Sequence, residues 1–479
     1  MERKFSLLVS EGEAKISARA LYDLGFYTVG EAVFAEARSL FKNFLRVLGA
    51  PVANMDVLLE RQRVYMDFCK NPTLVDEIEK YCCRAQEFYL NPFGKTFRTV
   101  HDRLKYYLSN TLALLDLYDE FPRVFSKFRF DSSVLGEYRQ KPCGPLKNEL
   151  ERLASLYTDT PFSVNVAFNN GFKLKSASLA GLQPTKKTLA SARNRKKREA
   201  ENAELPEDSI FFGGNNMIHN VANELKTSMI LNLCQNISSI NSAVKDFFAN
   251  IRAEAAFYEA ALMLQRYIEE KGLPLCMPKI DCRAGGGIFA KGVYDLCLSA
   301  VLAPESIVSN DISMENGKIL IVTGHNRGGK TTFLKSVGIS QILAQAGLFA
   351  TAGEYSCPLY NGILTHFPSG EDDSLGDGKL AEELTRLKQD FHVLRGGGLA
   401  LFNESFTTTT TREGSEIGID VLRAVCASGS HAVFVTHLME LAESRKLIGS
   451  TVSLTTESAD SYKIAEGEPL ADIYAYDML

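Results

Sequence analysis

Hydrophobic residues recur at helical spacing over two long stretches of the chain. Between residues 97 and 122 an apolar residue appears every three or four positions, and Pro122 closes the pattern. A second stripe runs from Met217 to Glu270 through Leu225, Met229, Leu233, Ile237, Ile240, Val244, Phe248, Ile251, Ala255, Tyr258 and Leu262. Each stripe predicts an amphipathic helix. As one helix the second would be about 75 Å long at 1.5 Å per residue, so we expect it to pack beside the earlier helix.

Between these stripes the hydrophobic period changes to two. Residues 162–168 alternate, residues 172–178 alternate again, and Asn169-Asn170-Gly171 lies between them. This pattern predicts a two-stranded hairpin with a glycine-containing turn. Pro184 ends it, so a small β insert is expected within about residues 160–216 of a helical region.

A basic run follows the predicted hairpin. Its seven basic residues are Lys186, Lys187, Arg193, Arg195, Lys196, Lys197 and Arg198. With few apolar residues to anchor it, the run is expected to be exposed. It can be a solvated loop tip without a partner, a contact to nucleic-acid phosphates, or a nuclear-localisation signal. It contains no aromatic residue, so base stacking is not indicated.

The second half of the chain contains an apolar run, Ile319 to Val322, then Gly-His-Asn-Arg-Gly-Gly-Lys-Thr at residues 324–331, then a helix-like segment to Ala346. The middle part fits G-x-x-x-x-G-K-[ST] between a strand and a helix, the context of a phosphate-binding (Walker A) loop. The glycines let backbone N–H groups and the helix dipole point at a phosphate. Lys330 would reach the β- and γ-phosphates of a nucleotide, and the Thr331 hydroxyl would ligate Mg²⁺.

Composition narrows the class of protein. A length of 479 residues indicates two or three domains. The net charge is −5, from 53 basic and 58 acidic residues, so the chain as a whole does not attract a polyanion. A nucleic acid would have to bind at a local basic patch. Ten cysteines without a C-x-x-C pair support neither zinc nor a disulfide framework and indicate the cytoplasm. We find no secretory signal and no apolar run near the roughly 18 residues of a membrane span, so no membrane is expected.

Beyond Ala284 the sequence resembles the MutS family of mismatch-repair ATPases. Asn326 stands two residues after the first glycine, as in the phosphate loop of that family, whereas His325 and Arg327 replace its usual Pro and Met. Residues 399–404, Leu-Ala-Leu-Phe-Asn-Glu, resemble its Walker B segment. The resemblance implies that Asn403, where the family has Asp, supports Mg²⁺ and that Glu404 orients the attacking water.

Two further segments are similar to switch elements of the same family. Residues 432–437 end in Thr-His, and the resemblance implies that His437 senses the γ-phosphate. Residues 378–384 occupy the signature region, where Gly378 would offer its N–H to the nucleotide of a dimer partner. The adenine-stacking aromatic falls near Ile307, which is not aromatic. The expected nucleotide-binding residues are Gly324, Asn326, Arg327, Gly328, Gly329, Lys330, Thr331, Thr332 and Gly378, the metal-binding ones are Thr331 and Asn403, and the catalytic ones are Glu404 and His437.

The helical half resembles the same family more loosely. Residues 55–64 and 71–74 look like the start of its helical core, and the order long helix, β and basic insert, long helix resembles its levers and clamp. The resemblance implies a multidomain fold. An all-α lever and clamp region with a small β insert would occupy residues 1–284, and an α/β P-loop ATPase domain of ABC/MutS type residues 285–479. The N-terminal mismatch-recognition domain has no counterpart, so mismatch reading is not expected.

The resemblance therefore implies a homodimeric ATPase, joined through its ATPase domain, that uses ATP and Mg²⁺. It would bind DNA of branched or unusual structure and couple its ATP state to clamp movement in DNA repair or recombination. One alternative is a nucleotide-switched scaffold with little turnover, which Asn403 favours. Another is the ATPase subunit of an ABC-type transporter, against which the long helices count.

Overall fold

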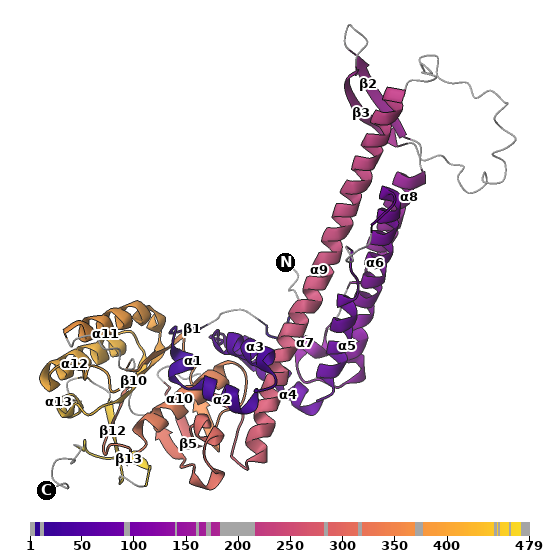
Figure 1. The fold of residues 1–479 in the computed structure, drawn as a ribbon. Coiled ribbons are helices and arrows are strands. Elements are labelled where there is room, and N and C mark those ends of the chain that lie inside the picture. Colours follow the sequence, from indigo (N-terminus) through magenta and orange to yellow (C-terminus); the bar gives the residue numbers. More distant parts are fainter. Residues whose placement is uncertain are drawn as a thin grey trace, which may run out of the picture. The chain divides into compact units, whose positions relative to one another are not determined.

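The computed structural model in Figure 1 describes residues 5–9, 14–90, 96–138, 141–159, 162–168, 174–182, 216–281, 286–314, 319–368, 377–444, 448, 451–458 and 461–470. The chain forms two compact units. The first comprises Met1–Val75, Phe128–Tyr138 and Ala253–Leu479, and the second comprises Asp76–Lys127 and Arg139–Arg252. The expected division at residue 284 stays a prediction.

Long helices build the second unit. They are α6 (Val100–Glu120), α8 (Gly144–Asp159) and much of α9 (Asn216–Glu270), with most of α5 (Leu74–Gln86) and the 3₁₀ helix η1 (Phe121–Lys127). The Thr99 side chain caps α6 by accepting from Asp102 N–H. Leu104 and Leu115 of α6 are buried with Ile230 and Ile237 of α9. Both predicted helices are therefore confirmed, as is their pairing within this unit. α9 runs without a break over 55 residues.

The predicted β insert is also present. Strands β2 (Phe162–Phe168) and β3 (Leu174–Leu182) pair antiparallel and form a sheet of their own. The two strands predicted from the alternation of apolar residues are thus confirmed. The predicted turn at residues 169–171 and the basic run at residues 186–198 lie outside the described residues.

A seven-stranded sheet organises the first unit. In spatial order it contains β1 (Lys15–Ile16), β9 (Gly362–His366), β10 (Gly398–Asn403), β11 (His431–Val435), β7 (Ile319–Thr323), β12 (Thr451–Thr456) and β13 (Ile464–Glu466). All neighbours are parallel except β12 and β13. Parallel strands are covered on both faces, which explains why β7, β10 and β11 are continuous apolar runs rather than alternating ones.

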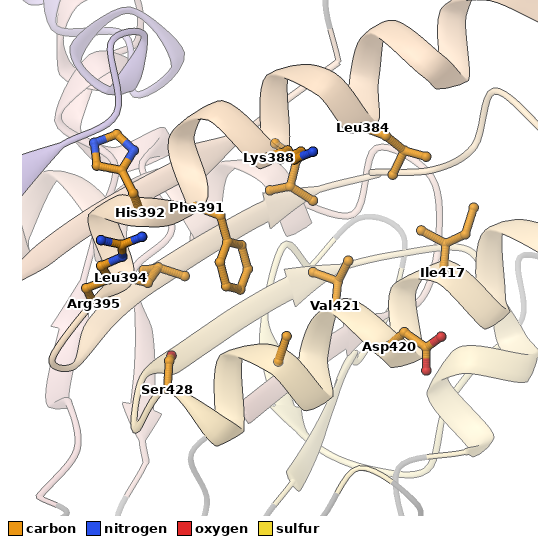
Figure 2. A pocket seen from close by; sticks show the side chains of 12 residues that line it. Leu384, Lys388, Phe391, His392, Leu394, Arg395, Ile417, Asp420, Val421 and Ser428 are labelled. Carbon is orange, nitrogen blue, oxygen red and sulfur yellow. The ribbon is translucent and has the colours of Figure 1, made fainter.

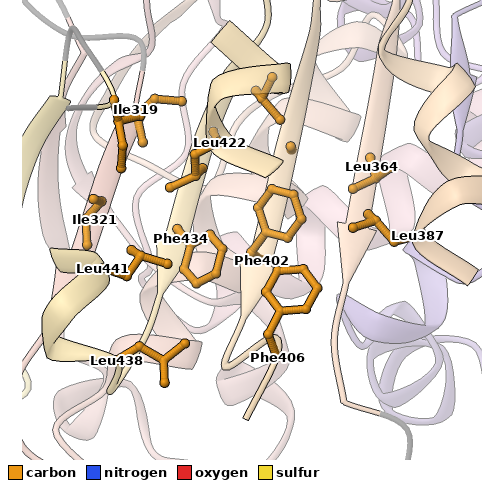
Figure 3. Close-up of a cluster of buried hydrophobic side chains, with 14 of the residues drawn as sticks. Ile319, Ile321, Leu364, Leu387, Phe402, Phe406, Leu422, Phe434, Leu438 and Leu441 are labelled. Atoms are coloured by element: carbon orange, nitrogen blue, oxygen red, sulfur yellow. The ribbon is translucent and has the colours of Figure 1, made fainter. Parts of the chain in front are cut away.

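The two faces of this sheet pack against different helices. On one face, Phe402 of β10 stacks on Phe434 of β11 at 5.1 Å, and Leu422 of α12 (Thr411–Ala427) joins the same cluster (Figure 3). The other face meets α10 (Lys330–Gln345), where a β-carbon on Gly338 would lie 2.7 Å from the Leu401 side chain. The sheet is therefore held firmly between helices.

Further elements complete the first unit. A four-stranded sheet contains β4 (Lys279–Ile280), β8 (Glu354–Cys357), β5 (Phe289–Val293) and β6 (Asn310–Ser313). The helices are α1 (Ala20–Asp23), α2 (Phe26–Val33), α3 (Arg38–Leu48), α4 (Met55–Lys70), α7 (Ser133–Gly136), α11 (Asp377–Asp390), α13 (Met439–Glu443) and the 3₁₀ turns η2 (Leu296–Ala300), η3 (Pro304–Ser306) and η4 (Phe391–Leu394). Among the described residues, no helix has an apolar stretch that would cross a lipid bilayer.

Candidate functional site

Three neighbouring parallel strands end at one edge of the large sheet. β10, β11 and β7 are adjacent in that order and end at Asn403, Val435 and Thr323. The carboxyl edge of a parallel sheet is where α/β proteins bind ligands. The loops that follow these strands carry the residues predicted for nucleotide binding and hydrolysis, so this edge is the candidate site.

The loop between β7 and α10 has a tightly constrained backbone. Gly324 and Gly329 adopt φ of +117° and +86°, and Arg327 is also left-handed at +61°. A β-carbon on Gly324 would lie 2.2 Å from Thr456 Oγ1. The same Thr456 hydroxyl accepts from His325 N–H at 3.0 Å. Glycine is thus required at position 324 by both conformation and space.

Lys330 begins α10 and is buried, with 4% of its surface exposed. Its Nζ donates to Gly324 O at 2.9 Å and to His325 O at 2.8 Å. The side chain therefore folds back over the loop, which holds the ammonium charge beside the loop backbone instead of in solvent. An ammonium in this position supplies the countercharge that a bound phosphate needs.

The predicted metal-binding pair lies side by side. Thr331 Oγ1 donates to Asn403 Oδ1 at 2.8 Å, and Asn403 is buried. Mg²⁺ prefers oxygen ligands, keeps several waters and is commonly held by one or two protein groups plus substrate phosphates. A hydroxyl and an amide oxygen fit such an ion, although neither adds negative charge.

Glu404 follows Asn403 and contacts the predicted γ-phosphate sensor. His437 Nε2 lies 3.0 Å from Glu404 Oε1. This hydrogen bond lowers the pKa of Glu404, burial opposes the shift, and the charges of His437 and Lys330 lower the pKa further. Glu404 N–H also donates to Val435 O at 2.9 Å, which ties the loops after β10 and β11 together. The result is an ionised carboxylate with a fixed position.

The other predicted residues are less central to this cluster. Gly378 lies in the first turn of α11, and residues 369–376 lie outside the described part of the chain. The proposed contact of Gly378 with the nucleotide of a dimer partner stays a prediction. Ile307 follows η3 and is half-buried.

Sequence reasoning missed an aromatic residue beside the phosphate loop. Tyr462 is 46% exposed, has a left-handed φ of +52° and lies with its Cβ 3.4 Å from the position of a β-carbon on Gly329. Asn310 Nδ2 donates to its carbonyl at 3.2 Å. An exposed ring here offers a surface for a nucleotide base. No local pattern indicated it, because only the pairing of β12 with β7 brings this turn to the loop.

The edge described above lies within a recognisable domain. Residues 320–464 match the family model of MutS domain V. The DNA mismatch repair protein MutS of Brevibacillus brevis is 24% identical over 330 residues, which cover 64% of this chain and 36% of that protein. The chain is thus similar to MutS proteins over about half of its length. The predicted resemblance is thereby confirmed.

Other relatives match shorter parts of this chain. The DNA mismatch repair protein MutS of Thermotoga maritima is 29% identical over 143 residues, 30% of this chain and 18% of that protein. The Listeria monocytogenes protein of the same name is 25% identical over 245 residues, 49% of this chain and 28% of that protein. The chain therefore spans 18% to 36% of the length of these curated relatives. Domain V contains Lys330, Asn403, Glu404, His437 and Tyr462.

Proposed function

We propose that this protein binds ATP with Mg²⁺ and hydrolyses it to ADP and phosphate. The observation that carries the proposal is the meeting of Lys330, Thr331, Asn403, Glu404 and His437 at one edge of the large sheet. Steady-state phosphate release from ATP, measured in parallel with ATP affinity, tests it. Tight ATP binding without phosphate release above the protein-free rate would contradict it.

Each residue of this cluster has a proposed task. The N–H groups of residues 324–332 and the Lys330 ammonium bind the phosphates, and Thr331 and Asn403 hold Mg²⁺. When bound, Mg²⁺ neutralises charge on the β- and γ-phosphate oxygens. Glu404 accepts a hydrogen bond from a water and directs its oxygen at the γ-phosphorus. As the new P–O bond forms, the bond from the γ-phosphorus to the β-phosphate oxygen breaks, the Glu404 carboxylate takes up a proton of the water, and ADP leaves. His437 orients Glu404 and senses the γ-phosphate.

The wider proposal concerns DNA. The curated relatives are named DNA mismatch repair proteins, which supports a role of this chain in DNA repair or recombination. We propose that it acts in the cytoplasm as a homodimer joined through the ATPase domain of residues 285–479. α6 and α9 would be levers, and the insert containing β2 and β3 a clamp on DNA. The DNA would be branched or otherwise unusual in structure.

Asn403 supports a second candidate, a nucleotide-switched scaffold with little turnover. Its amide oxygen is hydrogen-bonded to Thr331 and supplies no charge beside Mg²⁺. A neutral partner weakens the attraction for the ion, so ATP would be bound and released more often than hydrolysed. The two candidates differ in phosphate release, not in ATP affinity.

Asn403→Asp is expected to tighten Mg²⁺ binding and to leave turnover equal to or above that of the parent. One added charge next to the ion is worth on the order of 1 kcal/mol or more near a protein surface, a several-fold change. The Mg²⁺ dependence of phosphate release measures it. Asn250→Asp adds the same charge at an exposed position of the other unit and is expected to change nothing. Lower turnover without tighter Mg²⁺ binding would contradict the assigned role of Asn403.

Changing Arg195, Lys196, Lys197 and Arg198 to Ala is expected to weaken DNA binding, most strongly at low salt. Each lost phosphate contact lowers the slope of log affinity against log salt by about 0.9, so four contacts change it by roughly 3 to 4. Titrations of duplex and four-way junction DNA over a range of salt measure the slope. The double variant Arg195→Lys and Arg198→Lys keeps the charge and should keep the slope. An unchanged slope in the Ala variant would leave the run as a solvated loop.

A further inference from the structure

The loop after β10 holds two non-glycine residues in the left-handed conformation. Glu404 has a φ of +48° and Phe406 a φ of +66°. Residues with a β-carbon keep such angles only when surrounding contacts hold them. The direction of the Glu404 carboxylate therefore depends on whatever anchors this loop.

Three consecutive residues of the loop are anchored separately. Glu404 N–H donates to Val435 O, and Ser405 Oγ donates to His366 O at 3.1 Å. Phe406 N–H donates at 2.9 Å to Glu383 Oε1 of α11. The first two anchors are backbone carbonyls of neighbouring strands. The third is a single carboxylate on a helix, and it holds the second left-handed residue.

The Glu383 carboxylate is itself fixed by other groups. Its Oε2 accepts from Thr408 Oγ1 at 3.2 Å, and its Oε1 lies 3.2 Å from Nε2 of the buried His366. Burial raises the pKa of Glu383, but the hydrogen bonds from His366, Phe406 and Thr408 outweigh it, so the pKa is lowered. The His366 ring stacks on the buried Phe406 ring at 5.8 Å (Figure 3 shows Phe406 in the core). Glu383 thus stays a charged acceptor at this end of the loop.

One side of α11 borders a cavity. A cavity of about 730 Å³ separates it from α12, lined by apolar residues such as Leu384, Phe391 and Val421 with Lys388 and Asp420 beside them (Figure 2). On its inner side Leu387 of α11 shares a buried cluster with Leu422 of α12, so a shift of α11 has to move against that core. Such a shift reaches the loop through the Glu383 carboxylate.

We propose that Glu383 is a positioning residue for hydrolysis. It ties α11 to the loop of residues 404–408 and so fixes the Glu404 carboxylate in its working direction. The proposal rests on the proposed ATP hydrolysis and adds a residue of α11 to it. Glu383 acts through Glu404 and need not touch the nucleotide.

Glu383→Ala is expected to lower kcat by about 10- to 100-fold, since misplacing a reacting group by about 1 Å can cost 100-fold. ATP affinity should stay within about twofold, because the phosphate loop lies between β7 and α10. Glu383→Gln keeps an oxygen that accepts from Phe406 N–H and should recover most of the turnover. Glu382→Ala is the matched control, because Glu382 is exposed and its side chain has no polar contact among the described residues. It should behave like the parent.

A double variant separates positioning from general damage. In a Glu404→Gln background, Glu383→Ala should cause no further loss of phosphate release. General damage to the site would instead lower phosphate release both in the parent and in the Glu404→Gln background. If circular dichroism shows that the Glu383→Ala protein is not folded, Glu383→Asp is used instead. The shorter side chain keeps the charge but moves the carboxylate oxygen away from Phe406 N–H. It is expected to lose kcat similarly.

Two outcomes would overturn the proposal differently. If Glu404→Gln abolishes phosphate release but Glu383→Ala and Glu383→Asp stay within about twofold of the parent, the positioning role is wrong and hydrolysis stands. If the parent releases phosphate no faster than Glu404→Gln, the proposed hydrolysis itself is wrong, and the role of Glu383 falls with it.

Discussion

Lys330→Ala is expected to weaken ATP binding at least about 100-fold. The Lys330 ammonium is buried and held over the phosphate loop by Gly324 O and His325 O. Hydrogen bonds to charged groups contribute about 1.5–3 kcal/mol each, and 1.4 kcal/mol is a factor of ten. Because Lys330 would serve both the β- and the γ-phosphate, losing it removes two such interactions and the main countercharge of a triphosphate.

Calorimetric titration with ATP and Mg²⁺ measures this loss. Lys388→Ala removes a charge from an exposed side chain of α11 and is expected to bind ATP like the parent. Thermal unfolding without nucleotide checks that Lys330→Ala stays folded. Parent-like affinity in a folded Lys330→Ala protein would mean that residues 324–331 are not the nucleotide site.

Glu404→Gln is expected to lower hydrolysis by roughly 10²- to 10⁴-fold, the usual contribution of a positioned acid–base group, while ATP binding stays intact. The lowered pKa of Glu404, caused first by its hydrogen bond from His437, keeps the side chain an ionised acceptor. Glutamine has the same size but cannot take up a proton from water. The phosphate loop and Thr331 are unchanged, so an ATP-bound dimer should accumulate.

Single-turnover phosphate release and size-exclusion chromatography with ATP test both parts of this expectation. Glu440→Gln, at an exposed position of α13, is the control and should keep parent turnover. A parent rate no higher than that of Glu404→Gln, together with tight ATP binding, would favour the nucleotide-switched scaffold over the enzyme.

Much of the local structure could be predicted from the sequence. The strand, glycine-rich loop and helix over residues 319–345 appear as predicted, as do strand structure in residues 399–403 and 432–435 and the two amphipathic helices. These features depend on residues that are close in the sequence, since apolar period and glycine spacing are local properties. The family resemblance rests on the same segments, and it proposed Asn403, Glu404 and His437 as site residues.

The contacts around the site were decided only by the tertiary structure. Thr456 and Tyr462 reach the phosphate loop because β12 pairs with β7, more than a hundred residues earlier in the chain. Glu383 meets Phe406 only because α11 lies beside the loop after β10. The seven-stranded sheet even begins with Lys15–Ile16, which pair with β9. β7, β10 and β11 are similarly apolar, so the residues of each strand do not specify which strand lies beside it. Strand order follows from how crossover helices of the whole unit pack on both faces of the sheet.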